Sequence, residues 1–456
     1  MINNWHKHLE SLGMIRPVAG GIQVDINAVI SSLNDRPANG SLCDHNCTSE
    51  YGHYTCPSAL SLNQSTLKKS LAPAENILKG IDVAIQGINI LQQQFLNESF
   101  DPYCEKFKIP DDIALVFKGI IEASPIEVNL SGGNPEIHPD IIDIIANLNQ
   151  RNGVVTNLTT TGRRIMRDPV FLDHLLTNPP DIISFSADDF ENVAQIKELK
   201  NNTPKELYER WKKIPKSCGQ RQKAIEAICA TSLLIDADKP DISFNLVVHS
   251  GNIDYANILI TELNNLFPRT HVFPYPSQTA FLYEKGNIHD HLKLEQFIDS
   301  MIDAHKEGRL PITRRLHYWL MLKSVCVLYG ANSQVVADMI GGHKFWQCYK
   351  TSLSNRYIQI SNSNTFSSRD IGGGYLGCAW NHETVSCGDV QIWDMNPQDV
   401  ADHISSGSSL NASLSKKPCT GCAFPRLMFD IVNSELGLDE SLIPTYLELR
   451  YKYAGY

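Results

Sequence analysis

Short apolar runs alternate with longer amphipathic stretches over much of the chain. The runs predict strands, at 21–27, 126–130, 154–159, 181–185, 242–248 and 270–273. In the longer stretches apolar residues recur every three or four positions, which predicts helices, at 66–97, 138–150, 168–177, 204–233, 253–267 and 294–306. Strands that alternate with helices indicate a parallel sheet with right-handed crossovers.

The number of strand–helix units limits which α/β fold the chain can form. Short apolar strands are typical of strands that are buried on both faces. Six units are too few to close an eight-unit barrel, so we expect an α/β fold with a partial (β/α)6 TIM-like barrel. Chemistry in such folds gathers at the carboxyl ends of the strands.

The pattern changes after the sixth unit. Apolar helical residues are followed by Arg356-Tyr-Ile-Gln-Ile360, by Ser/Asn-rich turn residues and by Gly372–Cys378, which predicts a β-hairpin with a long loop. This second part is expected to form a smaller C-terminal α+β domain. The expected regions are an N-terminal segment at 1–20, the barrel at 21–309, a helical bridge at 310–345, the C-terminal domain at 346–430 and a tail at 431–456.

Composition excludes some classes of protein. No run of eighteen apolar residues occurs, so no membrane span is expected. The N-terminus lacks the apolar core of a signal peptide, and we expect a cytoplasmic protein. The net charge of −10 disfavours a nucleic-acid partner.

The 12 cysteines carry the strongest chemical signal. In a reducing compartment, clustered cysteines bind metal more often than they form disulfides. Cys43, Cys47 and Cys56 offer three thiolates on one loop, which suits an iron–sulfur cluster with one iron left open to a reactant. The residues leave open a zinc site, with His45 or His53 as fourth ligand, and a disulfide. Elsewhere, Cys229 and Cys326 lie in apolar helical patterns and are expected to be core residues.

A glycine pair follows the second expected strand, in the order Ser131-Gly132-Gly133-Asn134. Without side chains at the glycines, the backbone can approach a ligand closely. Free amides and carbonyls at such a turn can hold an amino group or a carboxylate. Taken alone, the pattern is also that of an ordinary strand-to-helix loop.

The glycine pair, the following Pro135-Glu-Ile-His-Pro139 and the later Asn157-Leu-Thr-Thr-Thr-Gly162 together resemble the radical S-adenosylmethionine (SAM) superfamily. Ser184-Phe-Ser-Ala-Asp188 is similar to the end of that family's fourth strand, and Asn245–Asn252 to its fifth. The resemblance covers about residues 21–285.

Two features depart from the family pattern. The usual cluster motif is Cys-x3-Cys-x2-Cys, whereas eight residues separate Cys47 from Cys56, which leaves His53 as a possible substitute for the third ligand. Asn134 stands where the family has an acidic residue.

The resemblance implies a four-iron, four-sulfur ([4Fe-4S]) cluster on Cys43, Cys47 and Cys56, with SAM chelated at the open iron. One electron, from a donor such as a flavodoxin or ferredoxin, would split SAM into methionine and a 5′-deoxyadenosyl radical. That radical would take a hydrogen atom from the substrate. The residues implied to bind SAM or line its site are Ser131, Gly132, Gly133, Asn134, Ser186, Asp188, Asn245 and His249.

The C-terminal cysteines resemble the twitch or SPASM extensions of the same superfamily. A second, auxiliary [4Fe-4S] cluster is implied on Cys348, Cys378, Cys419 and Cys422, with Cys387 as an alternative to Cys378. Structural zinc is the alternative for these residues.

Relatives with such extensions often modify peptides, so the implied substrate is a peptide or protein side chain. One alternative is radical oxidation or rearrangement of a small metabolite. A further alternative is a zinc-stabilised binding protein without catalytic activity.

Overall fold

The computed structural model describes part of the chain, and each structural statement below concerns that part. The described residues are 20–25, 28–30, 39–41, 73–106, 111–123, 125–131, 134–187, 197, 201–211, 223–238, 240–248, 252–276, 291–307, 319, 357–361 and 392–406.

One parallel sheet organises the molecule. Its strand order is β8-β7-β6-β5-β4-β1-β9, and each neighbouring pair is parallel. The six expected strands are confirmed, and consecutive ones are neighbours, as expected of strand–helix units wound in one direction. The strands are β1 (Gly20–Asp25), β4 (Ile126–Ser131), β5 (Val154–Thr160), β6 (Ile182–Ser186), β7 (Asp241–Val248), β8 (His271–Pro276) and β9 (Tyr357–Ser361).

Strand β9 was predicted at nearly the same residues, but its pairing with β1 was not predicted. It joins the main sheet beside β1, where Ile22 is opposite Ile358. The second strand of the expected hairpin, at 372–378, lies outside the described residues. A separate antiparallel pair follows β1 and consists of β2 (Ala28–Ile30) and β3 (Asn39–Ser41).

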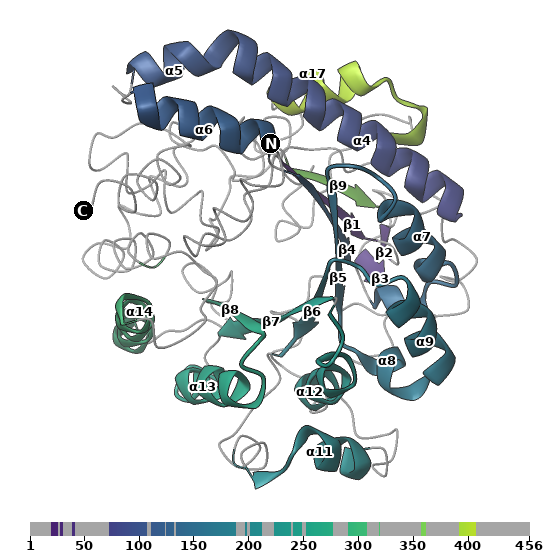
Figure 1. Cartoon of the computed structure of the whole chain (residues 1–456), viewed down its shortest axis with the longest axis vertical. Helices are drawn as coiled ribbons and strands as arrows, with labels where there is room; N and C mark the ends of the chain where they lie inside the picture. Colours follow the sequence, from purple (N-terminus) through teal and green to yellow (C-terminus); the bar gives the residue numbers. More distant parts are fainter. Residues whose placement is uncertain are drawn as a thin grey trace.

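Helices follow one side of the curved sheet (Figure 1). Helices occur in all six predicted helical stretches. Those that follow the six strands are α4 (Ala74–Gln94), α7 (Ile141–Leu148), α8 (Arg163–Arg167), α9 (Pro169–Thr177), α11 (Pro204–Trp211), α12 (Lys223–Leu234), α13 (Ala256–Leu266) and α14 (His291–Lys306). None of the described helices is long and apolar enough to cross a membrane.

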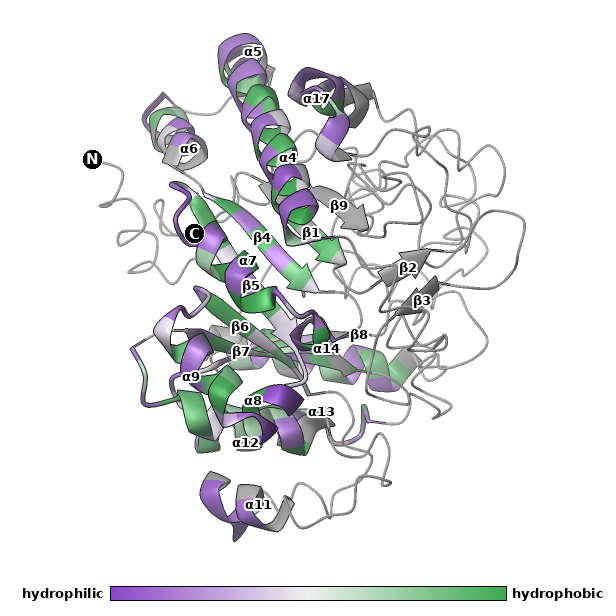
Figure 2. Ribbon diagram, turned by 90° about the vertical axis from the view of Figure 1, so that its right-hand side faces the viewer, coloured by the Kyte–Doolittle hydropathy of each residue, from purple (hydrophilic) through white to green (hydrophobic). Residues whose placement is uncertain are grey.

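Two further helices precede β4, where no element was predicted. A π-helical turn at Phe95–Ser99 links α4 to α5 (Phe100–Lys106), and α6 (Asp111–Ala123) follows. In Figure 2, α4 carries hydrophobic and hydrophilic residues in turn along its length, as expected of a helix with one buried face.

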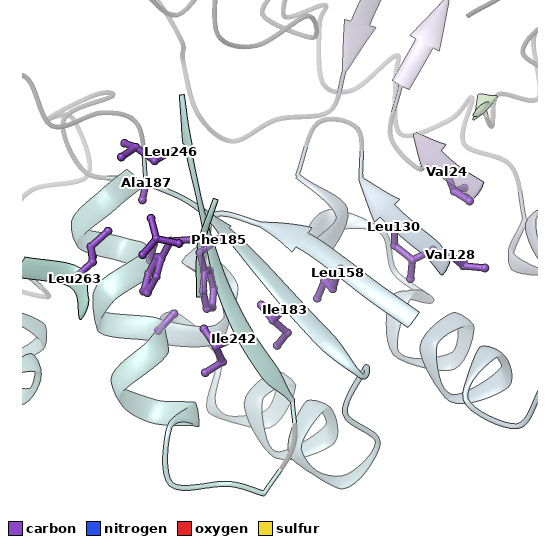
Figure 3. Packing of buried hydrophobic residues seen from close by; sticks show 14 of the residues in the cluster. Val24, Val128, Leu130, Leu158, Ile183, Phe185, Ala187, Ile242, Leu246 and Leu263 are labelled. Carbon is purple, nitrogen blue, oxygen red and sulfur yellow. The ribbon is translucent and has the colours of Figure 1, made fainter. Parts of the chain in front are cut away.

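The hydrophobic core lies between the sheet and these helices. Paired positions on neighbouring strands put one row of apolar side chains across the sheet, and Figure 3 shows its members: Val24, Leu130, Leu158, Ile183 and Ile242. All five are buried. Since side chains alternate between the two faces of a strand, the residues between them face the other side of the sheet.

A segment from the C-terminal part of the chain packs on α4. It contains a 3-10 turn at Ile392–Asp394 and helix α17 (Pro397–Ser406). Val400 is fully buried, and a Cβ added to Gly87 of α4 would lie 2.8 Å from its Cγ1 atom. Glycine at position 87 therefore permits the close approach of the two helices.

Replacement of Gly87 by alanine tests this contact. Overpacking costs about 1–3 kcal/mol, and the better helix propensity of alanine returns about 1 kcal/mol, so we expect a net loss of about 1 kcal/mol in urea unfolding. In a Val400→Ala background, which removes Cγ1, the same replacement should cost less, although Val400 Cβ and the Pro397 carbonyl oxygen would still lie 3.1 and 3.2 Å from the new methyl group. An equal loss in both backgrounds would show that the contact does not matter.

Candidate functional site

The carboxyl ends of the parallel strands meet along one edge of the sheet. Ser131 ends β4, Thr160 ends β5 and Ser186 ends β6, where it is paired with Asn245 of β7. The backbone N–H of Ala187 donates to the carbonyl oxygen of Asn245 at 2.8 Å, which continues the pairing past the end of β6. Four residues expected to bind SAM therefore lie at or near the carboxyl-end edge of one sheet, on or just after β4, β6 and β7: Ser131, Asn134, Ser186 and Asn245.

The residue that follows the glycine pair is held by a side-chain contact. Asn134 is 1% exposed, and its Oδ1 accepts a hydrogen bond from Thr160 Oγ1 at 3.1 Å. Thr160 Oγ1 in turn accepts from the backbone N–H of Gly162 at 3.2 Å. One hydroxyl thus joins the loop after β4 to the loop after β5. Gly132 and Gly133 lie outside the described residues, as do Asp188 and His249.

A second contact joins the same two loops. Glu136 is fully buried, and its Oε2 accepts from the backbone N–H of Arg164 at 2.7 Å. The Arg164 side chain returns the contact, because Nη1 donates to the carbonyl oxygen of Glu136 at 2.7 Å. Asn134, Glu136, Thr160 and Arg164 are called the turn clamp below.

Gly162 has a backbone conformation that suits glycine. Its φ is 78°, in the left-handed region, at the start of α8. A Cβ at this position would lie 2.6 Å from Ala230 Cβ and 2.8 Å from Phe185 Cε1. Glycine is needed here both for the turn and for the packing of α8 against α12 and β6.

Charged side chains join α8 to α12. Glu226 of α12 is fully buried, and its Oε1 accepts from Arg163 Nε at 3.0 Å. Arg167 lies 3.9 Å from the same oxygen. A buried carboxylate needs such partners, because an unpaired buried charge is costly.

Asp168 begins the next helix. Its Oδ1 accepts from the backbone N–H of Phe171 at 3.1 Å and its Oδ2 from Arg164 Nε at 3.1 Å. The hydrogen bond from Phe171 is the main cause that holds the pKa of the Asp168 carboxyl below its ordinary value, with a further contribution from Arg164. The ionised side chain therefore stabilises the start of α9 as an N-cap.

Replacement of Asp168 tests this cap and its pH dependence. Asp168→Ala should lower the free energy of unfolding by about 1 kcal/mol at pH 7, whereas Asp168→Asn keeps an acceptor and should cost less. Because the folded-state pKa is lowered, the contribution of the charge is present above the ordinary pKa of 3.8 and is lost as the pH falls below it. The advantage of the wild type over Asp168→Asn in urea unfolding should therefore shrink below about pH 4; a constant difference down to pH 3 would refute the assignment.

The inner face of the sheet, opposite the core row, is polar. Asn157 Nδ2 donates to Glu127 Oε1 at 2.8 Å, and Ser184 Oγ donates to Asn157 Oδ1 at 3.0 Å. The hydroxyls of Ser184 and Ser243 lie 2.8 Å apart, so the network crosses four strands. Burial raises the pKa of the Glu127 carboxyl, and the hydrogen bond from Asn157 opposes that shift.

Sequence reasoning did not find this polar row. Its signal was present in the alternation of polar residues at every second position, clearest in Glu127, Asn129 and Ser131 of β4. The row places amide, hydroxyl and carboxyl groups on the inner face of the sheet, and a few placed polar groups are what fix a polar ligand in a binding site.

The cysteines expected to bind metal lie outside the described residues: Cys43, Cys47, Cys56, Cys348, Cys378, Cys387, Cys419 and Cys422. Within the described residues, no three His, Cys, Asp or Glu side chains gather as metal ligands. Cys229 is fully buried, as predicted, and burial, aided by Glu226, raises the pKa of its thiol to about 12. Cys229 therefore packs as a small residue of the hydrophobic core.

Comparisons with known proteins add little. No protein-family model and no curated protein matches the chain. Among solved structures, the chain is similar to SuiB of Streptococcus suis, in a crystal structure with the precursor peptide SuiA. The identity is 11%, the match covers 89% of this chain and 70% of that chain, and the TM-score is 0.41. This likeness is too weak to support an inference about activity.

Proposed function

We propose that the protein is a radical SAM enzyme that modifies a peptide or protein side chain. The observation that carries the proposal is the order of polar residues at the carboxyl ends of β4, β5, β6 and β7. Ser131 and Asn134 flank the glycine pair after β4, Ser186 ends β6, and Asn245 of β7 is paired with Ser186. This is the order in which the superfamily places its SAM-binding residues, on a parallel sheet whose consecutive units are neighbours.

The donor chemistry fits the implied cofactors. In the proposal, the thiolates of Cys43, Cys47 and Cys56 hold a [4Fe-4S] cluster, because thiolate is the ligand that such clusters require. Three thiolates would leave one of the four irons open to the amino and carboxylate groups of SAM. With SAM at this iron, the cluster would supply one electron, and SAM would supply the group that abstracts a hydrogen atom.

Around that cofactor, the residues of the chain have separate roles in the proposal. The backbone at Gly132 and Gly133 takes the amino group, with Ser131 and Asn134 on either side. Ser186 and Asp188 take the carboxylate or ribose hydroxyls, and Asn245 and His249 contact the ribose or the substrate. The polar inner face, from Glu127 to Ser243, fits the amino, carboxylate and hydroxyl groups of SAM better than an apolar interior would.

The C-terminal part completes the proposal. Cys348, Cys378, Cys419 and Cys422 would hold an auxiliary [4Fe-4S] cluster, with Cys387 as the rival of Cys378. A flavodoxin or ferredoxin would supply electrons. The substrate assignment to a peptide or protein side chain depends on the similarity of this cysteine order to twitch and SPASM extensions.

The test is an anaerobic assay of the reconstituted, reduced protein with SAM and candidate peptides encoded nearby. We expect 5′-deoxyadenosine and methionine in equal amounts, together with a change in the mass of one peptide. Absence of 5′-deoxyadenosine under strong reduction would contradict the proposed activity. Its formation without a mass change in any peptide would favour a small-molecule substrate.

A further inference from the structure

We propose that Asn134 acts as a positioning residue through Thr160, and that the turn clamp holds the residue after the glycine pair in place for SAM. This inference rests on the proposed function and extends it to two residues of β5 and α8, Thr160 and Arg164. In this inference the partner of the Asn134 side-chain oxygen is Thr160, and not SAM.

Asn134 and Thr160 are both buried. Asn134 is 1% exposed and Thr160 is 3% exposed, so their hydrogen bond of 3.1 Å is shielded from water. A hydrogen bond that is shielded from water contributes more than one exposed to it, so its loss should loosen the position of Asn134. The Thr160 hydroxyl has a defined direction, because it donates to Asn134 and accepts from the Gly162 N–H.

The turn clamp and the end of β4 lie on either side of the glycine pair. Ser131 is held at the end of β4, where its register partner is Asp25 of β1. Asn134 is held by Thr160, and Glu136 is held by both the backbone and the side chain of Arg164. Two residues separate Ser131 from Asn134, so the chain on either side of the glycine pair has a fixed start and a fixed end.

The turn clamp should reduce the free energy that SAM binding spends on ordering the backbone. A ligand that meets a backbone already in place does not have to order it, and this raises affinity without any new contact. The clamp joins positions 26 and 28 apart in sequence. It therefore makes the turn after β4 depend on the turn after β5. We expect the clamp to affect SAM affinity more than the rate of turnover at saturating SAM.

The Thr160 hydroxyl can be tested with a matched pair of variants. Thr160→Val keeps the shape of the side chain and removes the hydroxyl, whereas Thr160→Ser keeps the hydroxyl. In the reconstituted protein, equilibrium dialysis with labelled SAM should show a Kd about tenfold higher for Thr160→Val and nearly unchanged for Thr160→Ser. Asn134→Ala should also raise the Kd. The double variant should be no worse than Thr160→Val alone, because Thr160→Val already removes the hydrogen bond to Asn134 together with the one from the Gly162 N–H.

A second readout needs neither cluster nor SAM. Hydrogen–deuterium exchange of the peptide that covers residues 131–136 should be faster in Thr160→Val and unchanged in Thr160→Ser. Equal SAM affinity in Thr160→Val and the wild type, or additive losses in the double variant, would overturn the clamp while leaving the proposed function intact. Failure of the wild type itself to bind SAM would contradict the proposed function.

Discussion

Gly162→Ala is expected to lower the free energy of unfolding by about 2–5 kcal/mol. A left-handed backbone costs a residue with a Cβ about 1–2 kcal/mol. The new methyl group would lie 2.6 Å from Ala230 Cβ and 2.8 Å from Phe185 Cε1, which adds about 1–3 kcal/mol of overpacking. Urea unfolding of the full chain, followed by circular dichroism, measures the loss.

The chain offers a matched control for this prediction. Gly153 has a φ of 75°, but a Cβ there would meet no atom within 4 Å. Gly153→Ala should therefore cost only the backbone term, about 1–2 kcal/mol. An Ala230→Gly change should recover part of the Gly162→Ala loss, even if the single variant is poorly folded. Equal losses at positions 153 and 162 would refute the packing argument.

Cys47→Ala is expected to abolish SAM cleavage. With one of three thiolates removed, the cluster proposed on Cys43, Cys47 and Cys56 should not be retained. Iron and sulfide should fall from about eight of each per chain, for two clusters, to about four. Formation of 5′-deoxyadenosine under strong reduction should fall to background.

Cys229→Ala is the control for the cysteine experiment. Its thiol is fully buried in the hydrophobic core, and no group of three metal-ligating side chains occurs in the described part of the chain, so it should not bind iron. Iron, sulfide and 5′-deoxyadenosine should stay at wild-type levels in this variant. Retention of full iron and activity by Cys47→Ala would contradict the assignment, and so would stoichiometric zinc in the wild-type protein.

The barrel strands could be predicted because their signal is local. Each of the six is a short run rich in apolar residues and bounded by turn residues, and each is present within a few residues of its expected range. The pairing of β9 with β1 joins residues such as Val24 and Ile360, which are far apart in sequence. No local pattern specifies such a partner, so the run at 356–360 was predicted as part of a hairpin.

The candidate site could be predicted only in outline. Ser131 and Ser186 lie at the ends of β4 and β6, Asn134 follows β4, and Asn245 is opposite Ser186 within β7. The resemblance assigned Asn134 to the SAM site, but its contact with Thr160 depends on a crossover and on side-chain rotamers. The cysteine ligands and the residues 132, 133, 188 and 249 stay predictions, since they lie outside the described part.

The most direct test of the central claim is electron–nuclear double resonance on the reduced, reconstituted protein. SAM labelled with 15N at its amino group and 17O at its carboxylate should show hyperfine coupling to the cluster, which means that both groups touch iron. Coupling should disappear in Cys47→Ala. If the wild-type cluster is formed and reduced but shows no coupling to either label, no iron is open to SAM and the account is wrong.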